Sequence, residues 1–287
     1  MQADLLFANF LNGLSFGCIL FLMATGLSIT MGLMRIVNLA HGALYMVGAY
    51  IGVSAAKVTG SFLLGMLAGG LCAALLGLVM EAGFLRRLYK RELDQVLLTI
   101  GIVYILTNVT QWIWGPIPLS GITPSLLSGS LALGRVTIPH FRLSIIAFGL
   151  AAAAALWLLQ EKTRVGAIVR AGMDNRNMTL VLGINIRAVF TGVFVSGAFL
   201  TGFCGLLGAP AFGVNLAIGW DALLLAMIVV IVGGVGSIQG AFLGGVMLGL
   251  IDAFGKAYFP DLAFFSIYLG LILILLIKPS GLMGRVI

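Results

Sequence analysis

Residues 188–220 read AVFTGVFVSGAFLTGFCGLLGAPAFGVNLAIGW, and no charged side chain interrupts them. Directly before them, residues 161–187 form the one long polar stretch in the second half of the chain. About 20 apolar residues in a helix cross the roughly 30 Å hydrocarbon layer of a membrane. The boundary at Arg187 therefore predicts a membrane helix that begins where a segment at the membrane surface ends.

The whole chain has the composition of a membrane protein. Hydrophobic residues make up 61% of its 287 residues, charged residues only 9%, and the mean hydropathy is +1.17. No water-soluble core of this size accommodates so much apolar surface. The sequence predicts an all-α, polytopic transmembrane helical bundle, a single domain over 1–287 with about eight or nine spans. The candidate spans are 5–33, 38–56, 61–85, 95–114, 143–160, 188–208, 221–233, 240–255 and 262–277.

The positions of the glycines lead to two predictions about helix packing. Small residues four apart let membrane helices approach closely, and close packing is the expected use of most of the pairs listed below. Gly233, Gly234 and Gly236 predict either a tight turn between two spans or a kink within one long span. The pairs are Gly13/Gly17, Gly48/Gly52, Gly65/Gly69, Gly236/Gly240 and Gly245/Gly249.

The basic residues fix the expected orientation. With nine spans, most Lys and Arg residues fall on one face, which the positive-inside rule makes cytoplasmic. The N-terminus is then outside and the C-terminus cytoplasmic. The net charge of +7 is thereby explained by topology and by attraction to anionic membrane lipid, without nucleic acid. The inner set is Arg35, Arg86, Arg87, Lys90, Arg91, Lys162, Arg164, Arg170, Arg176, Arg187, Lys278 and Arg285, and the outer set Lys57, Arg135, Arg142 and Lys256.

The long segment 115–142, on the outer side, contains four prolines with several Ser and Gly residues. It is expected to be an extracytoplasmic loop or a re-entrant stretch.

The polar stretch predicts two short helices at the membrane surface. Val165, Ile168, Val169 and Met173 keep helical spacing, and the pattern breaks at 174–175. Asp174 or Asn175 can cap a second helix, which Gly183 ends after Leu182 by adopting a left-handed conformation. An idle interfacial helix has the same pattern, so periodicity alone does not assign a role.

Polar residues within the spans are candidates for a translocation path. They are Asn12, Asn38, His41, Asn108 and Gln111. Asn38 and His41 are expected near the cytoplasmic end of their span. At that position, a role in helix capping or in a hinge explains them as well as contact with the solute does. Asp252 is expected to pair with Lys256 one turn later.

The sequence gives little support for a catalytic site or a metal site. Residues 13–17, GLSFG, match the nucleophile pattern of serine hydrolases, yet they lie in an apolar helix rather than a strand-to-helix turn. Two separated histidines without an acidic cluster argue against a metal site, and the three cysteines lie in apolar spans as packing residues. The phosphate-binding pattern GxxxxGK[ST] is absent, so ATP, if used, is bound by another chain.

Several motifs together resemble one family. They are Gly166, Arg170-Ala171, Asn175 and Gly183-Ile184 in the polar stretch, IVNLAHGA at 36–43, LTIG at 98–101, GGVGSIQGAFLGG at 233–245 and KPSGLMGR at 278–285. Spread over most of the chain, they resemble the branched-chain amino-acid (LivH/LivM) family of ABC-transporter permeases, LivH type.

The resemblance implies a non-catalytic permease in the bacterial inner membrane. Residues 161–187 would hold the cytoplasmic coupling segment, with Gly166, Arg170, Ala171, Asp174, Asn175, Gly183 and Ile184 as coupling residues. The implied partners are ATP-binding cassette subunits that bind ATP and Mg²⁺, a second identical or homologous permease, an external solute-binding protein and an amino-acid substrate. Urea and short amides stay open as substrates. At Met178-Thr179 the sequence departs from the small residues of the family, which leaves the packing of the second helix open.

An ion-coupled secondary transporter is the alternative function. Proton coupling usually needs a carboxylate deep in the membrane, whereas Glu81, Asp221 and Asp252 fall toward the ends of spans. Sodium coupling through backbone carbonyls escapes that objection.

Overall fold

The computed structural model describes residues 2–34, 37–89, 91–124, 127, 129–133 and 136–284. Four of the basic residues sorted above lie outside these ranges, namely Arg35, Lys90, Arg135 and Arg285. Ile36, the first residue of the IVNLAHGA motif, also lies outside them. The described chain contains eleven α-helices. They are α1 (Gln2–Met34), α2 (His41–Thr59), α3 (Phe62–Val79), α4 (Glu92–Trp114), α5 (His140–Lys162), α6 (Arg164–Asp174), α7 (Arg176–Val181), α8 (Ile186–Phe212), α9 (Ile218–Gly233), α10 (Ile238–Tyr258) and α11 (Ser266–Ile277).

The all-α prediction is confirmed, and seven helical segments of the described chain are long and apolar enough to cross a membrane. They are Asp4–Met34, Phe62–Leu88, Glu92–Trp114, His140–Lys162, Ile186–Phe212, Ile238–Tyr258 and Pro260–Ile277. Helix α9 is apolar but shorter, and α2 is buried along most of its length. Each of the nine sequence segments proposed as spans coincides with one helical segment of the bundle.

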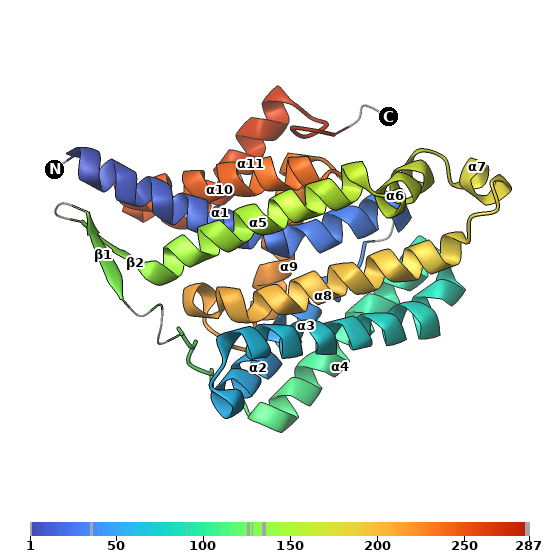
Figure 1. Ribbon diagram of the computed structural model, residues 1–287, viewed down its shortest axis with the longest axis horizontal. Coiled ribbons are helices and arrows are strands. Elements are labelled where there is room, and N and C mark those ends of the chain that lie inside the picture. The colour runs from blue at the N-terminus through green and yellow to red at the C-terminus, as the bar shows by residue number, and fades with distance from the viewer. Residues whose placement is uncertain are drawn as a thin grey trace.

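The segment between α4 and α5 holds a feature that the sequence did not predict. Strands β1 (Ser130–Leu133) and β2 (Val136–Pro139) pair antiparallel, with Ser130 opposite Pro139. The short hairpin lies beside the N-terminal end of α1 (Figure 1). Alternation is weak in so short a segment, and its prolines and glycines favour a loop by composition.

Glycines lie at the contacts between the central helices, and the close packing that their spacing predicts is present there. A Cβ atom built on Gly17 would lie 2.8 Å from the carbonyl oxygen of Gly245, so α1 and α10 touch through their backbones. A Cβ atom on Gly48 would lie 2.3 Å from the Cα of Gly202, which brings α2 equally close to α8. In lipid, such close contact is what drives helices together.

The glycines between α9 and α10 form a tight turn, not a kink. Gly234 and Gly236 have φ of 98° and 82°, in the left-handed region that suits glycine. The amide of Gly236 donates to Ser28 Oγ at 3.2 Å, which fixes the turn to α1. Ser237 then caps α10 by accepting from the Gly240 amide at 2.9 Å.

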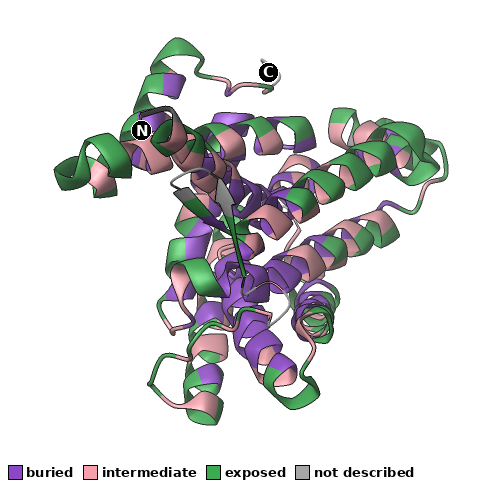
Figure 2. Cartoon of the chain, turned by 60° about the vertical axis from the view of Figure 1, so that its left-hand side comes forward, coloured by how far each residue is buried: buried purple, intermediate pink, exposed green. Residues whose placement is uncertain are grey.

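The buried residues gather along the middle of the bundle, and the exposed ones lie on its outer helices and at its ends (Figure 2). Helix α2 contributes Tyr45, Met46 and Tyr50 to this core, each with no exposed surface. The three cysteines are free thiols, of which Cys18 and Cys204 are buried and Cys72 is half-buried.

Candidate functional site

Helices α6 and α7 lie at one end of the bundle, opposite the N-terminus and the hairpin (Figure 1). Thr163 begins α6 by accepting a hydrogen bond from the Gly166 amide at 3.1 Å. Asn175 then begins α7 by accepting from the Met178 amide at 3.0 Å. The two helices that the sequence predicted are therefore present, and Asn175 rather than Asp174 is the cap.

Helix α6 is fastened to the end of α5. A Cβ atom on Gly166 would lie 2.1 Å from the carbonyl oxygen of Gln160, so only glycine permits this approach. Arg170 donates to the same carbonyl oxygen, and its Nη1 lies 3.4 Å from Glu161 Oε2. A displacement of α6 would consequently pull on the long α5.

The other side of α6 lies against the end of α1 and the α9–α10 turn. A Cβ atom on Gly172 would meet Leu33 at 2.9 Å, and one on Gly236 would meet the Met173 methyl group at 2.5 Å. A cavity of about 760 Å³ opens between α6, the end of α1, that turn and the residues after α11. Arg170, Met173 and Asp174 line it, so α6 forms one wall of a hollow at this end.

Helix α7 and the residue after it expose several large apolar side chains. Its Thr179 is buried and donates to the Asn175 carbonyl oxygen at 2.9 Å, which holds the first turn. Gly183, with φ of 77°, ends the element after Leu182, as predicted. The large apolar side chains exposed here are Met178, Leu180, Val181 and Leu182.

The chain passes from α7 into α8 without a long loop. Ile184 is half-buried, Asn185 caps α8 by accepting from the Ala188 amide at 3.2 Å, and Ile186 is buried. Ala171 contributes through its backbone, since its carbonyl oxygen accepts from the Asn175 amide at 2.9 Å. The seven predicted coupling residues thus belong to one continuous unit between α5 and α8.

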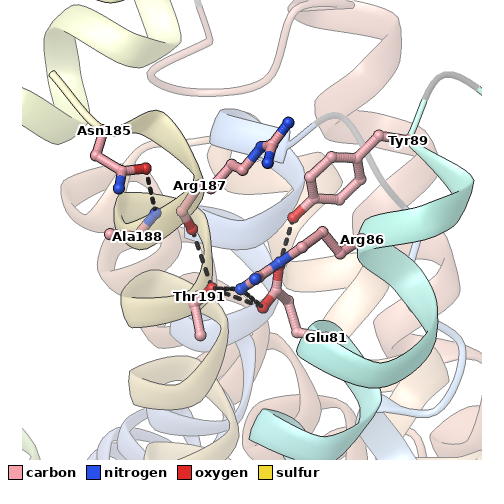
Figure 3. A network of polar contacts seen from close by, with 7 residues as sticks. All are labelled: Glu81, Arg86, Tyr89, Asn185, Arg187, Ala188 and Thr191. Carbon is pink, nitrogen blue, oxygen red and sulfur yellow. Dashed lines mark hydrogen bonds and ion pairs between the residues drawn. The ribbon is translucent and has the colours of Figure 1, made fainter. Parts of the chain in front are cut away.

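A polar network ties the first turns of α8 to the end of α3 (Figure 3). Glu81 lies in a π-helical turn, Met80–Phe84, that extends α3, and has no exposed surface. Thr191 of α8 donates to Glu81 Oε2 at 2.6 Å, and the Tyr89 hydroxyl donates to Oε1 at 2.6 Å. Arg86 Nη2 donates to Glu81 Oε2 at 3.2 Å and to Thr191 Oγ1 at 2.7 Å.

The sequence placed Glu81 at the end of a span but missed this network. A buried carboxylate is stable only when charge and hydrogen bonds compensate it, and here Arg86 and two hydroxyl groups do so. Arg86 and Tyr89 follow Glu81 closely in the chain and were a usable local signal. Thr191 gave none, because it comes from a distant helix.

The predicted path residues do not converge. His41 begins α2, where its Nε2 lies 2.9 Å from both the Met23 carbonyl oxygen and Thr201 Oγ1. Both partners belong to the middle of long helices, so the ring lies deep in the bundle rather than near an end. Asn38, just before it, accepts from the Ala40 amide at 3.1 Å and helps to start α2.

The remaining three path residues lie elsewhere. Asn12 on α1 accepts a hydrogen bond from Arg142 Nη1 at the N-terminal end of the bundle. Asn108 and Gln111 are exposed on α4, where Asn108 donates to the Tyr104 carbonyl oxygen at 2.7 Å. Asp252 makes the predicted pair with Lys256 at 2.6 Å.

Comparison with known proteins assigns the family. The family model described as "Branched-chain amino acid transport system / permease component" matches residues 9–277. The permease BraD of Pseudomonas aeruginosa is 31% identical over 96% of this chain and 94% of its own length. LivH of Escherichia coli strain K12 is 30% identical over the same shares.

The match to a sugar permease is partial. The galactose/methyl galactoside import permease MglC of Salmonella typhimurium is 30% identical over 56% of this chain and 49% of its own. No solved structure matches. Since the helical bundle and nearly the whole sequence agree with the family, the chain is a multi-pass membrane protein that belongs to the permease components of ABC branched-chain amino-acid transport systems.

Proposed function

We propose that this permease forms the path through which an ATP-driven importer carries branched-chain or related hydrophobic amino acids across the bacterial inner membrane. The main support for this proposal is the match over nearly the full chain to BraD and LivH, both named as high-affinity branched-chain amino-acid permeases. The galactose permease covers only about half of the chain, which supports the amino-acid class over a sugar. ATP and Mg²⁺ belong to separate ATPase subunits.

The proposed topology has nine spans, formed by α1–α5 and α8–α11, with the N-terminus outside and the C-terminus inside. The α6–α7 end carries Lys162, Arg164 and Arg170, in keeping with the positive-inside rule. Arg142 and Lys256 belong to the opposite, outer end, at the start of α5 and the end of α10. Anionic lipid would contact the basic inner face.

Residues 161–187 act as the coupling segment in this proposal. The exposed apolar side chains of α7 suit a groove on an ATPase subunit, because a large apolar patch outside the bilayer normally marks an interface. The Arg170 contacts would pass a displacement back into α5, and the Asn185 cap and Thr191 would pass it on into α8 and α3. Rigid helices transmit such a displacement, whereas a flexible loop absorbs it.

The complex would also contain a second permease, identical or homologous, and an external solute-binding protein that delivers the amino acid. Asn12, Asn38, His41, Asn108 and Gln111 stay proposed path residues, with Asn108 and Gln111 on a side of α4 that faces out of this chain. Polar side chains there are costly in lipid, which favours a path at the permease–permease boundary for those two.

The function is tested by reconstituting the permease in liposomes with and without its ATPase subunits. Leucine uptake is expected only with the ATPases, internal ATP and the external binding protein. Dissipating sodium and proton gradients should leave that uptake intact. Uptake that this chain supports alone, driven by an ion gradient, would instead establish a secondary transporter.

Replacing Gly183 tests the junction between α7 and α8. Val at φ of 77° is strained, because a branched side chain rarely adopts the left-handed region. Gly183→Val is therefore expected to lower solute-stimulated ATP hydrolysis by about tenfold, within the usual range of coupling energies. Gly183→Asn is the matched control, since asparagine tolerates this conformation and should retain most stimulation. Equal loss in both variants would contradict a conformational role for this glycine.

A further inference from the structure

A second cavity, of about 560 Å³, opens at the end of the bundle opposite α6–α7. The start of α1, the start of α5 and the ends of α8 and α10 enclose it. Its size and mixed lining are typical of sites that bind small molecules. On the topology proposed above, it faces the outside of the cell.

The cavity brings both signs of charge together. Asp252 is buried, and its Oδ2 lies 2.6 Å from Lys256 Nζ. Arg142 supplies a second cation and donates one hydrogen bond to Asn12 Oδ1. A guanidinium group has five donors, so Arg142 retains capacity for a carboxylate. The formal charges of Asp252, Lys256 and Arg142 sum to +1.

An unused donor points to a ligand. Asn9 is one of the lining residues, and its Nδ2 atom is buried behind the cavity surface, with no hydrogen-bond partner among the described residues. Leaving a buried donor unpaired is unfavourable. A turn of the Asn9 side chain toward the cavity would bring this donor, together with Arg142, to a ligand oxygen.

Apart from Ser15, the rest of the lining is apolar. Phe16, Ile19, Phe141 and Ile145 form much of the wall, and Lys256 Nζ lies 5.4 Å from the centre of the Phe16 ring. Such a wall accepts an aliphatic side chain, whereas Ser15 is the one hydroxyl group of the lining that a sugar could use. The lining therefore has separate places for a carboxylate, an ammonium group and a branched hydrocarbon.

We propose that this cavity is an entry site for a free zwitterionic α-amino acid with an aliphatic side chain. The carboxylate binds Arg142 and the Asn9 amide, the ammonium group binds Asp252 as Lys256 turns outward, and the side chain packs on the apolar wall. Lys256 can move, because its side chain is 59% exposed while that of Asp252 is 8% exposed. This inference rests on the proposed function for the substrate class.

The test measures occupancy of the cavity in the complete transporter, in proteoliposomes. Ala257→Cys places a thiol on the cavity wall, and a membrane-impermeant maleimide labels it from outside. Leucine is expected to slow this labelling about fivefold at saturation. Two analogues, 4-methyl-2-oxopentanoate without the ammonium group and isopentylamine without the carboxylate, should need at least about tenfold higher concentration for equal protection.

Matched controls separate occupancy from general effects. Val58→Cys, exposed at the outer end of α2 and outside the cavity, should label at the same rate with and without leucine. Asp252→Asn and Arg142→Gln, each combined with Ala257→Cys, should lose the protection. Asp221→Asn and Lys57→Gln, which lie outside the lining, should keep it. Monodisperse elution in detergent and an unchanged thermal midpoint of the Asp252→Asn variant show that it is folded.

The outcomes distinguish this site from the function it serves. Absence of protection in a complex that imports leucine with ATP would overturn the site and leave the function intact. Full protection in Asp252→Asn would show that the Asp252–Lys256 pair is structural only. Protection by the solute-free binding protein alone would make this surface a receptor contact and would also overturn the proposal. Protection without ATP-driven uptake would support the site and count against the import function.

Discussion

Replacing Gly42 with Val is expected to leave almost no folded permease. A Cβ atom at this position would lie 1.8 Å from the carbonyl oxygen of Gly219 and 2.9 Å from the Cβ of Leu223. The obstacle is backbone, which no rotamer change removes. The amount of monodisperse protein after extraction in detergent should fall by at least about tenfold, since overpacking costs 1–3 kcal/mol even where side chains give way.

The location of Gly42 makes the effect large. It follows His41, which joins the start of α2 to the middle of α1 and α8. In lipid, helices gain little from hiding apolar surface from one another, so their contact depends on close approach. Moving α2 away from α9 would therefore open the centre of the bundle rather than one edge.

Gly101→Val is the matched control for this prediction. Gly101 also lies within a membrane helix, α4, but a Cβ atom there meets nothing within 4 Å. Its yield and thermal midpoint should stay close to those of the unmodified protein. A Gly42→Val protein with an unchanged midpoint would show that α2 and α9 separate without cost, which contradicts the packing described here.

The helices could be predicted from the sequence because lipid leaves the backbone few choices. Every amide within the bilayer must be bonded inside its own segment, so an apolar run of sufficient length becomes a helix. The polar stretch was equally readable, since Asn175 and Gly183 act through bonds and backbone angles within a few residues. Local chemistry of this kind does not depend on the rest of the fold.

The arrangement of polar residues could not be predicted in the same way. Glu81 and Thr191 meet across 110 positions of sequence, and His41 and Thr201 across 160. A polar residue in a span indicates its approximate depth but not the direction in which it points. For that reason the sequence predicts the same role for Asn108, Gln111 and His41. In the structure, however, Asn108 and Gln111 are exposed on α4 and point away from the bundle.

Reversing the charge of Arg170 is expected to uncouple the transporter. In Arg170→Glu, a carboxylate would replace the cation 3.4 Å from Glu161, and the Gln160 carbonyl oxygen would lose its donor. ATP hydrolysis stimulated by the solute-loaded binding protein should fall by at least about tenfold, at the upper part of the range for coupling between sites. Membrane insertion and yield should be retained, because the change lies outside the spans.

Two further variants decide whether the position or only the charge matters. Lys162→Glu makes the same charge reversal on an exposed residue next to Glu161 and should retain most stimulation. Arg170→Glu combined with Glu161→Arg restores an ion pair of opposite polarity and should recover part of it. Loss in Lys162→Glu equal to that in Arg170→Glu would reduce the effect to surface charge.

The Arg170 result also separates two routes out of the coupling segment. One runs back into α5 through Arg170, and the other runs on into α8, where Thr191 meets Glu81 at the end of α3. If stimulation survives in Arg170→Glu but is lost in Gly183→Val, the force passes through α8 alone. If either change alone removes the stimulation of ATP hydrolysis, α5 and α8 must move together. The pair α6–α7 is attached to α5 at one end and to α8 at the other, and as a rigid unit it transmits force only while both attachments hold.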